Sequence, residues 1–194
     1  MSEVEDHLGF ALPSNKITVY VLYYTQPHGI KVTGMRFLTD LEWPIKIVAR
    51  NAAHEMMHPP YDLKNDKELA GQLYTLKNDG FIMDKVDHHD RSFGYNTFEG
   101  LIEEDSVQAV EQLIDEKLKI ENDARERWKE NDGGIHVFAV ALYSLMKEAK
   151  FPQDHETFRE FLIRMIGTGK LSPGKIRPIY DAFYATAQPS FSGP

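Results

Sequence analysis

Hydrophobic and β-branched residues gather in two short runs near the start of the chain. Residues 16–24 (KITVYVLYY) and 29–39 (GIKVTGMRFLT) are separated by a segment that contains proline and glycine. Runs of this composition bounded by turn-forming residues are typical of β-strands. The sequence therefore predicts two strands, which pair either with each other as a hairpin or with different strands.

The pattern changes to a helical period at Pro44. The apolar residues that recur at this spacing are Ile45, Val48, Ala52 and Met56. Pro44 suits the first turn of a helix, where its missing N–H costs no hydrogen bond. Pro59 and Pro60 then stop the helix, because proline removes donors and clashes with the preceding turn. The prediction is a helix over residues 44–58.

Most of the remaining chain also shows helical patterning. The expected helices cover residues 66–77, 97–131, 135–150, 154–167 and 172–186, and the last two open with the capping residues Asp154 and Ser172. Residues 81–96 show no clear period and are predicted as a long loop, of a length that is often functional. These elements predict an α+β fold in a single domain, 1–194, with a β-rich part over 10–40 and a helical part over 44–186.

Composition narrows the classes of function. Of the 194 residues, 42% are hydrophobic, which is enough to bury a core. No apolar run approaches the roughly 18 residues that cross a bilayer, so no membrane span is expected. The formal charge of −8, without a basic patch, argues against nucleic acid as a partner. The absence of cysteine excludes disulfides, thiolate catalysis and cysteine-ligated zinc.

The first nine residues are acidic and contain neither a basic nor an apolar stretch, so no signal peptide is predicted. The location stays open, because a mature secreted or periplasmic form would already have lost such a segment. The oligomeric state is open as well.

The motif that carries chemistry is His54-Glu55-Met56-Met57-His58, an HExxH sequence on the predicted helix. Residues four apart lie on the same helix face, so two imidazoles can reach one Zn²⁺ ion. Glu55 stands beside the first ligand, where it can take a proton from a zinc-bound water. The motif therefore predicts zinc-dependent hydrolysis of a peptide or protein substrate, with His54 and His58 as metal ligands and Glu55 as the general base.

A catalytic zinc needs a third protein ligand. The extended motif of the metzincins is absent, since Tyr61 and Lys64 stand where it has glycine and histidine. Residues 96–103 (NTFEGLIE) instead place two glutamates one helical turn apart, and here the sequence resembles the gluzincin peptidases, the thermolysin-like and aminopeptidase-like zincins. The resemblance implies a zincin-like fold with Glu99 as the third ligand, and Glu103 accepting a hydrogen bond from the far nitrogen of a ligand histidine.

The match to the gluzincins has two departures. Glutamate stands where the thermolysin pattern has aspartate, and the double proline after His58 ends the motif helix early. Other third ligands remain open: Glu103 itself comes second, and a loop residue comes third, namely His88, His89 or Asp90. Glu104 lies far around the helix from Glu99, so the two cannot both face one ion.

Peptidases of this type also use a donor that stabilises the oxyanion. The candidates are Tyr95, His136, Tyr180 and Tyr184, with Tyr95 and His136 first. Residues 29–39 are the strand that the gluzincin resemblance would place beside an extended substrate. The alternative function is a catalytically inactive zincin-like domain that binds metal or a protein partner.

Overall fold

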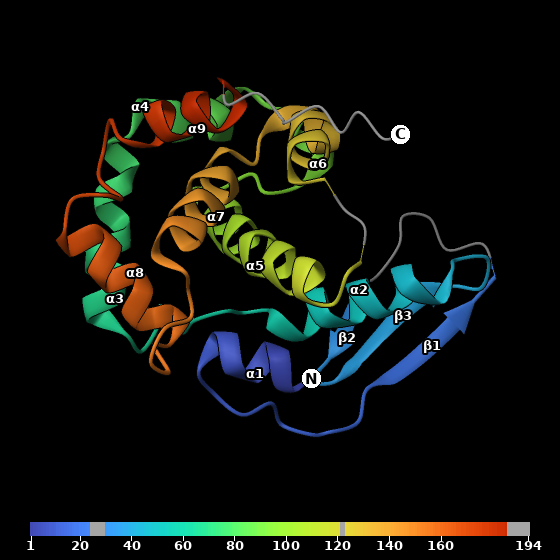
Figure 1. Ribbon diagram of the computed structural model, residues 1–194. Coiled ribbons are helices and arrows are strands. Elements are labelled where there is room, and N and C mark those ends of the chain that lie inside the picture. Colours follow the sequence, from blue (N-terminus) through green and yellow to red (C-terminus); the bar gives the residue numbers. More distant parts are fainter. Residues whose placement is uncertain (24–29, 121–122, 186–194) are drawn as a thin grey trace, which may run out of the picture.

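The computed structural model describes residues 1–23, 30–120 and 123–185. In this part of the chain a small sheet lies close to the N-terminal end and helices make up most of the rest (Figure 1). The predicted α+β class is confirmed. The end of the first predicted strand, Thr186 of the last predicted helix, and the C-terminal tail lie outside the described residues.

The sheet has three strands: β1 (Thr18–Leu22), β2 (Ile30–Thr33) and β3 (Arg36–Asp40). Their order is β1-β3-β2, with β1 parallel and β2 antiparallel to β3. The run predicted as one strand over 29–39 is thus a hairpin, because the chain reverses at Gly34, whose φ of 51° is a conformation that glycine adopts without strain. As a result β2 is an edge strand.

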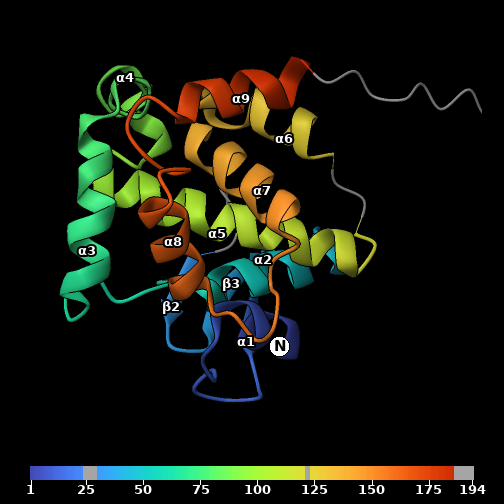
Figure 2. The same cartoon turned by 60° about the vertical axis from the view of Figure 1, so that its left-hand side comes forward.

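The sheet lies at one side of the molecule next to α1 and α2, and the other α-helices lie beyond α2 (Figures 1 and 2). In chain order they are α1 (Ser2–Leu8), α2 (Ile45–Met57), α3 (Lys67–Leu73), α4 (Gly80–His88), α5 (Phe98–Lys117), α6 (Ala124–Glu130), α7 (Val137–Ala149), α8 (Phe158–Gly167) and α9 (Ile176–Ala185). Three short 3-10 helices connect them: η1 (Tyr74–Asn78), η2 (Arg91–Phe93) and η3 (Asn131–Gly134).

Helix α2 is the element that joins the sheet to the helical part. It packs against β3 on one side and against α5 on the other (Figure 1). The carbonyl of Pro44 accepts the first hydrogen bonds of the helix, and the chain turns extended at His58, directly before Pro59. The predicted helix is therefore present as Ile45–Met57, with His54 in its last turn and His58 as the residue that follows it.

Two predicted elements were wrong, one loop and one helix. Residues predicted as a loop over 81–96 form α4 for half of that length, because Asp79 caps the helix and Ile82 and Val86, four apart, are buried. The helix predicted over 97–131 ends at Lys117, followed by Lys119 in a left-handed conformation, and α6 begins after the cap Asp123.

Smaller corrections concern helix starts. Helix α8 starts at Phe158 under a Thr157–Glu160 capping box rather than at Asp154, which lies outside the helix with a positive φ. Helix α9 starts at Ile176 rather than directly after Ser172. Helix α1 was not predicted; it precedes the β-rich part of the chain.

The buried hydrophobic side chains form one cluster that runs from α1 through α2 and α5 to α9. Its largest members lie on the central helices and α8, with Trp128, Phe138, Phe158 and Phe161 fully enclosed. Helix α5 packs most extensively on α7, and α2 lies across α5, so the site-bearing face of α2 rests on the best-buried helix of the protein. Among the described residues, none of the helices has both the length and the apolar character that a membrane crossing needs.

Candidate metal centre

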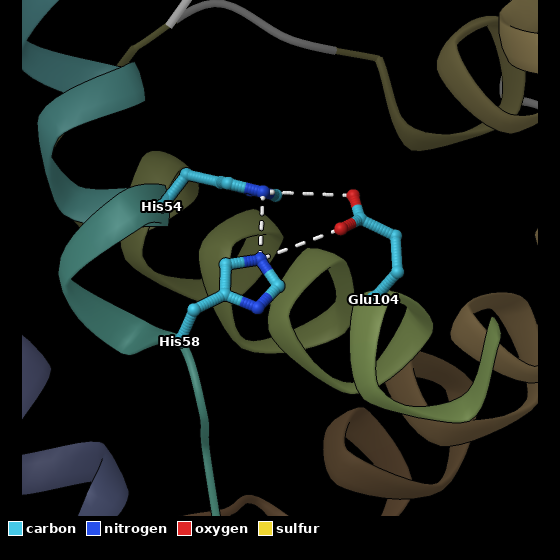
Figure 3. A group of neighbouring side chains, drawn as sticks. All are labelled: His54, His58 and Glu104. Carbon is cyan, nitrogen blue, oxygen red and sulfur yellow. Dashed lines mark hydrogen bonds and ion pairs between the residues drawn. The ribbon is translucent and has the colours of Figure 1, made fainter. Parts of the chain in front are cut away.

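Three side chains from α2 and α5 converge on one point (Figure 3). His54 and His58 lie one turn apart near the end of α2, and Glu104 reaches them from the second turn of α5. The two histidine Nε2 atoms are 3.1 Å apart. His54 Nε2 lies 3.5 Å from one Glu104 oxygen and His58 Nε2 lies 3.4 Å from the other. In the described part of the chain, this is the group that could hold a metal ion.

These separations match the edges of a small coordination tetrahedron. Ligand atoms placed roughly 2.0–2.1 Å from a tetrahedral metal lie roughly 3.3–3.4 Å from one another. The two distances to Glu104 end on different oxygens, and with one oxygen as ligand the two imidazoles and the carboxylate leave one corner of the tetrahedron for a fourth ligand. The arrangement thus has the shape of an open metal site, although the geometry by itself does not identify the metal.

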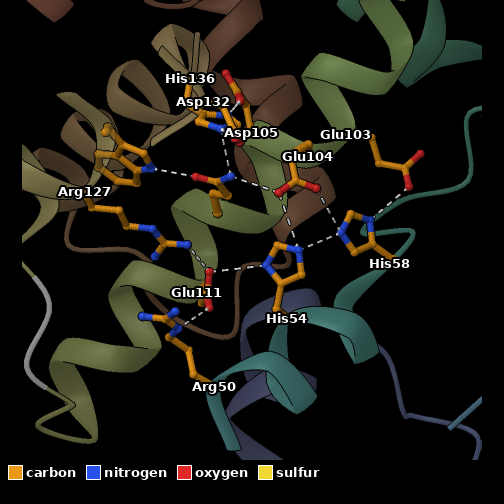
Figure 4. A network of polar contacts seen from close by, with 12 residues as sticks. Arg50, His54, His58, Glu103, Glu104, Asp105, Glu111, Arg127, Asp132 and His136 are labelled. Atoms are coloured by element: carbon orange, nitrogen blue, oxygen red, sulfur yellow. Dashed lines mark hydrogen bonds and ion pairs between the residues drawn. The ribbon is translucent and has the colours of Figure 1, made fainter. Parts of the chain in front are cut away.

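Each histidine is oriented by a carboxylate on its other ring nitrogen (Figure 4). His54 Nδ1 lies 3.3 Å from Glu111, and His58 Nδ1 lies 3.2 Å from Glu103. A neutral imidazole has a single N–H, so donation from Nδ1 leaves a lone pair on Nε2. Both Nε2 atoms then point at the same place as the Glu104 carboxylate, where a proton or a metal ion relieves the repulsion between their lone pairs.

Glu104 is also held before any ion binds. Gln108, one turn further along α5, donates its amide N–H to a Glu104 oxygen at 2.9 Å. The indole N–H of Trp128 donates to the Gln108 carbonyl at 2.9 Å, which fixes the orientation of the amide. With only 6% of its surface exposed, Glu104 cannot turn away from the histidines without breaking these bonds.

The carboxylates give this site a strong negative field. Burial by itself would lower the pKa of the His54 imidazole, but Glu111 and Glu104 reverse that effect and raise it to about 10. The pKa of His58 is raised against the same effect of burial by Glu103 and Glu104. Burial would raise the pKa of Glu104, yet the two histidines and Gln108 hold it well below its usual range. The site therefore attracts positive charge, either protons or a metal ion.

Glu55 lies between this cluster and the edge of the sheet. Its carboxylate accepts a hydrogen bond from the backbone N–H of Lys31 on β2. Burial is the main cause that raises the pKa of Glu55, and the nearby Glu104 adds to it. The Lys31 ammonium donates to the backbone carbonyl of His58, so β2 is tied to both ends of the HExxH segment.

Two cavities flank the histidines. The larger, of about 880 Å³, lies on the His58 side and is lined partly by Tyr61, Leu63 and Tyr74. The smaller, of about 250 Å³, lies on the His54 side, and both Glu55 and Tyr95 line it. A ligand that reached the convergence point would therefore extend into two spaces of different size.

The structure does not place Glu99 with the histidines. Its carboxylate accepts a bond from Lys77 at 2.7 Å, and the side chain is 44% exposed. Glu99 lies in the first turn of α5, whereas α2 crosses α5 further along, beside Glu104. The prediction of Glu99 as ligand is corrected to Glu104, which had been set aside because it lies on a different face of the helix.

Glu103 has the contact that the sequence led us to expect, a hydrogen bond with the far nitrogen of His58. The rival ligands further along the chain have local roles instead. His88 is 75% exposed and bonds to Asp84, the His89 ring contacts backbone carbonyls, and Asp90 caps η2.

The candidate oxyanion donors differ in whether they line a cavity beside the histidines. His136 is fully buried and held by Asp105 at 2.7 Å and Asp132 at 3.0 Å, so it cannot face a cavity, and we withdraw it as a donor. Tyr180 and Tyr184 contact each other in α9 with their rings tilted by 54°, and they line neither cavity beside the histidines. Tyr95 remains: it lines the smaller cavity, and its hydroxyl is hydrogen-bonded to Glu104.

Tyr95 has a further unusual property, a φ of 56°. This left-handed conformation costs a non-glycine residue roughly 1–2 kcal/mol. Its ring is held edge-on to His136 with centroids 5.8 Å apart, which gives His136 a packing role behind the site. Burial, followed by Glu104, raises the pKa of the Tyr95 hydroxyl, so it stays protonated and able to donate.

The residues that sequence reasoning missed share one helix face. Glu104, Gln108 and Glu111 stand at positions i, i+4 and i+7 of α5, and all three are buried. The sequence by itself does not single out this stripe, because α5 contains many other polar residues, among them Asp105, Gln112 and Asp115. Only the burial and contacts of the stripe in the structure mark the face that carries the ligand.

Comparisons of the chain with protein-family models, with curated proteins and with solved structures found no match.

Proposed function

We propose that this chain is a zinc-dependent peptidase. The observation that carries the proposal is the convergence of His54, His58 and Glu104 within 3.1–3.5 Å of one another, beside a glutamate in the position of a general base. Two imidazoles and one carboxylate, with a fourth position open, form the ligand set of catalytic zinc sites in peptidases.

The donor set favours zinc over magnesium and calcium. Magnesium and calcium prefer six or more oxygen ligands, whereas the imidazole nitrogens here supply two of three donors. The carboxylates behind both imidazoles increase their basicity and so strengthen the coordinate bonds.

When bound, zinc would supply an activated water and polarise the carbonyl of the scissile bond. Glu55 takes the proton of the attacking water and passes it to the leaving amine; its raised pKa suits both steps. In the balanced reaction the peptide C–N bond breaks, hydroxyl adds to the acyl carbon, and the proton completes the amine. The Tyr95 hydroxyl donates its single proton to Glu104 in the structure, and it would have to turn from Glu104 to stabilise the oxyanion that develops on the carbonyl oxygen.

The zincin-like relationship belongs to this proposal and not to the observed fold. It is supported by an HExxH helix, a glutamate ligand on a later helix, and an antiparallel edge strand, β2, directly beside the motif. The Lys31 contacts with Glu55 and His58 hold β2 beside the motif, so an extended substrate could pair with the part of its edge that Glu55 does not occupy.

The substitution Glu55→Gln tests the proposal. We expect the variant to keep its zinc, because Glu55 is not a ligand, and to lose cleavage of casein or of a peptide library by roughly 100-fold or more. Glu126→Gln, an exposed change on α6 remote from the histidines, serves as the matched control and should cleave normally.

Zinc content is measured by elemental analysis and cleavage by mass spectrometry. Equal cleavage by the wild type and Glu55→Gln would remove Glu55 from the mechanism. Zinc binding without cleavage by the wild type would favour the inactive metal-binding alternative.

A further inference from the structure

The smaller cavity beside the metal centre is lined by two arginines, Arg50 and Arg127, together with His54 and Glu55. Figure 4 shows both arginines beside Glu111, which also contacts His54. The larger cavity contains no arginine among its described lining residues. The basic side chains that line the larger cavity are instead two lysines, Lys31 and Lys64, so the two sides of the candidate site differ in the kind of cation and in size.

Arg127 is already paired with a carboxylate of the protein. Its guanidinium bonds to Glu111 and to the side-chain oxygen of Gln112, and its side chain is only 9% exposed. Glu111 in turn uses the same oxygen for Arg127 and His54. Arg127 is thus part of the support behind His54.

Arg50 has no comparably close carboxylate among the described residues. Its nearest carboxylate oxygen, on Glu111, lies 3.6 Å from Nε, which is beyond hydrogen-bond distance. Among the described residues, none accepts a hydrogen bond from its two terminal nitrogens. With 28% of the side chain exposed, these donors are available to a ligand in the smaller cavity.

A guanidinium with free terminal nitrogens is suited to a carboxylate, which it binds through two parallel hydrogen bonds. Arg50 lies four residues before His54 on α2, an axial distance of roughly 6 Å. One residue of extended peptide spans roughly 3.3–3.6 Å. A carboxylate one residue beyond the scissile bond therefore falls within reach of Arg50.

The chemistry also sets the direction of the peptide. In the proposed reaction Glu55 delivers a proton to the leaving amine, so the leaving half of the substrate lies on the side of Glu55. Glu55 lines the smaller cavity and not the larger one. The smaller cavity thus receives the C-terminal half.

The volume limits how much of that half can enter. At about 250 Å³ the cavity is smaller than the roughly 300–1,000 Å³ that encloses a drug-sized ligand. It has room for a single residue. The larger cavity, of about 880 Å³, has room for several residues on the acyl side.

We propose that the smaller cavity binds the C-terminal residue of a peptide, that Arg50 pairs with its α-carboxylate, and that the enzyme releases single residues from C-termini. This inference rests on the proposed peptidase function and adds the substrate class to it. Hydrolysis then yields a free amino acid and a peptide shortened by one residue.

The activity test uses the zinc-loaded protein with pairs of N-blocked peptides that differ only at the C-terminus, free acid against amide. We expect cleavage of the last bond in the acid, and a value of kcat/KM at least about tenfold lower for the amide. Arg50→Gln should remove this difference. Lys46→Gln, an exposed change one turn earlier on α2, should retain it.

A binding test separates this inference from the peptidase itself. The probe is 2-benzylsuccinate, which has one carboxylate for the metal and a second for Arg50, compared with the monoamide that lacks the second charge. Titration calorimetry should show tighter binding of the diacid by about tenfold or more in the wild type and in Lys46→Gln. Arg50→Gln should bind both compounds alike.

Three results would overturn the inference. Equal cleavage of acids and amides at internal bonds would show an endopeptidase and leave the proposed function intact. If C-terminally amidated peptides were cleaved best at the bond that precedes an internal aspartate or glutamate, the smaller cavity would bind an acidic side chain and not a C-terminal carboxylate. Carboxylate-dependent binding of the probe without cleavage of any peptide would overturn the peptidase, and the C-terminal assignment with it, and leave a carboxylate-binding pocket.

Discussion

At the scale of single residues, the Glu104 carboxylate is held in place by its neighbours on α5 and by Tyr95. Gln108 and the Tyr95 hydroxyl both bond to it, and Trp128 orients Gln108. Preorganised ligands bind a metal more tightly, because less side-chain freedom is lost when the ion arrives. The same supports explain why a buried carboxylate with two histidine partners is tolerated on a helix face otherwise turned to the core.

The third ligand can be tested by exchanging one carboxylate at a time. Glu104→Gln removes a charged ligand, and we expect zinc affinity to fall by more than roughly 100-fold. Loss of a residue that only hydrogen-bonds to a ligand typically lowers metal affinity by roughly 10–100-fold. Glu99→Gln should leave zinc affinity unchanged, because Glu99 bonds to Lys77 and is 44% exposed. Competition with a chromogenic chelator measures both affinities. The reverse order of effects would contradict the observed arrangement of α2 and α5.

At the scale of elements, the site depends on the crossing of α2 and α5, and α1 supports that crossing. Helix α1 packs against α2, α5 and α8. It ends at Gly9, whose φ of 81° and close approach to Thr157 leave no room for a Cβ atom. His7 is the polar residue that α1 buries: it is 3% exposed and donates from Nδ1 to the Glu3 carbonyl at 2.7 Å.

His7 should make the protein sensitive to mild acid. Burial lowers the pKa of its imidazole, with a smaller contribution in the same direction from Lys117. A folded pKa below the unfolded value of about 6.5 means that the unfolded chain binds the proton more readily. The stability contributed by neutral His7 is therefore complete above about pH 6.5 and is lost as the pH falls through the folded pKa.

We expect the free energy of unfolding of His7→Gln to decline less between pH 7 and pH 5 than that of the wild type. At pH 7 the variant should be less stable by about 1 kcal/mol, since a buried group changes its packing and hydrogen bond. Urea unfolding at several pH values measures both quantities. His88→Gln is the matched control, since this side chain is 75% exposed, and its pH slope should equal that of the wild type. Equal slopes for all three proteins would rule out His7 as the acid-sensitive group.

At the scale of the whole molecule, a metal held by α2 and α5 would link the sheet-bearing part of the chain to the helical core. The ligands lie far apart in sequence, at positions 54, 58 and 104, so the unfolded chain has no comparable site. An ion that binds only the native state stabilises it according to its concentration relative to Kd.

Removal of zinc should therefore lower the Tm. At free zinc about 100-fold above Kd the stabilisation is about 2.7 kcal/mol, which corresponds to roughly 5–11 °C for a chain of this length. Scanning calorimetry with and without a chelator measures the shift, and added zinc should reverse it while added magnesium should not. An unchanged Tm on chelation and zinc addition would contradict a native zinc site.

Much of the fold followed from local patterns. The motif helix and its proline stop, the α+β order and most later helices were predicted, because they depend on spacing, capping residues and breakers that are adjacent in the chain. The two wrong predictions, at α4 and at the break after Lys117, also concern local signals. Asp79 and Asp123 act as caps there, and these capping signals were overlooked in favour of an apparent loop and an apparent long helix.

The sequence by itself determined that two imidazoles and a glutamate share the end of one helix, because a separation of four residues places side chains on one face whatever the rest of the chain does. Only the tertiary structure decided which carboxylate meets them. Helical periodicity states which residues of α5 lie together, but not which of its faces rests on α2. That choice came from the packing of α5 between α2 and α7, which turned Glu104, Gln108 and Glu111 toward the histidines and left Glu99 beside Lys77.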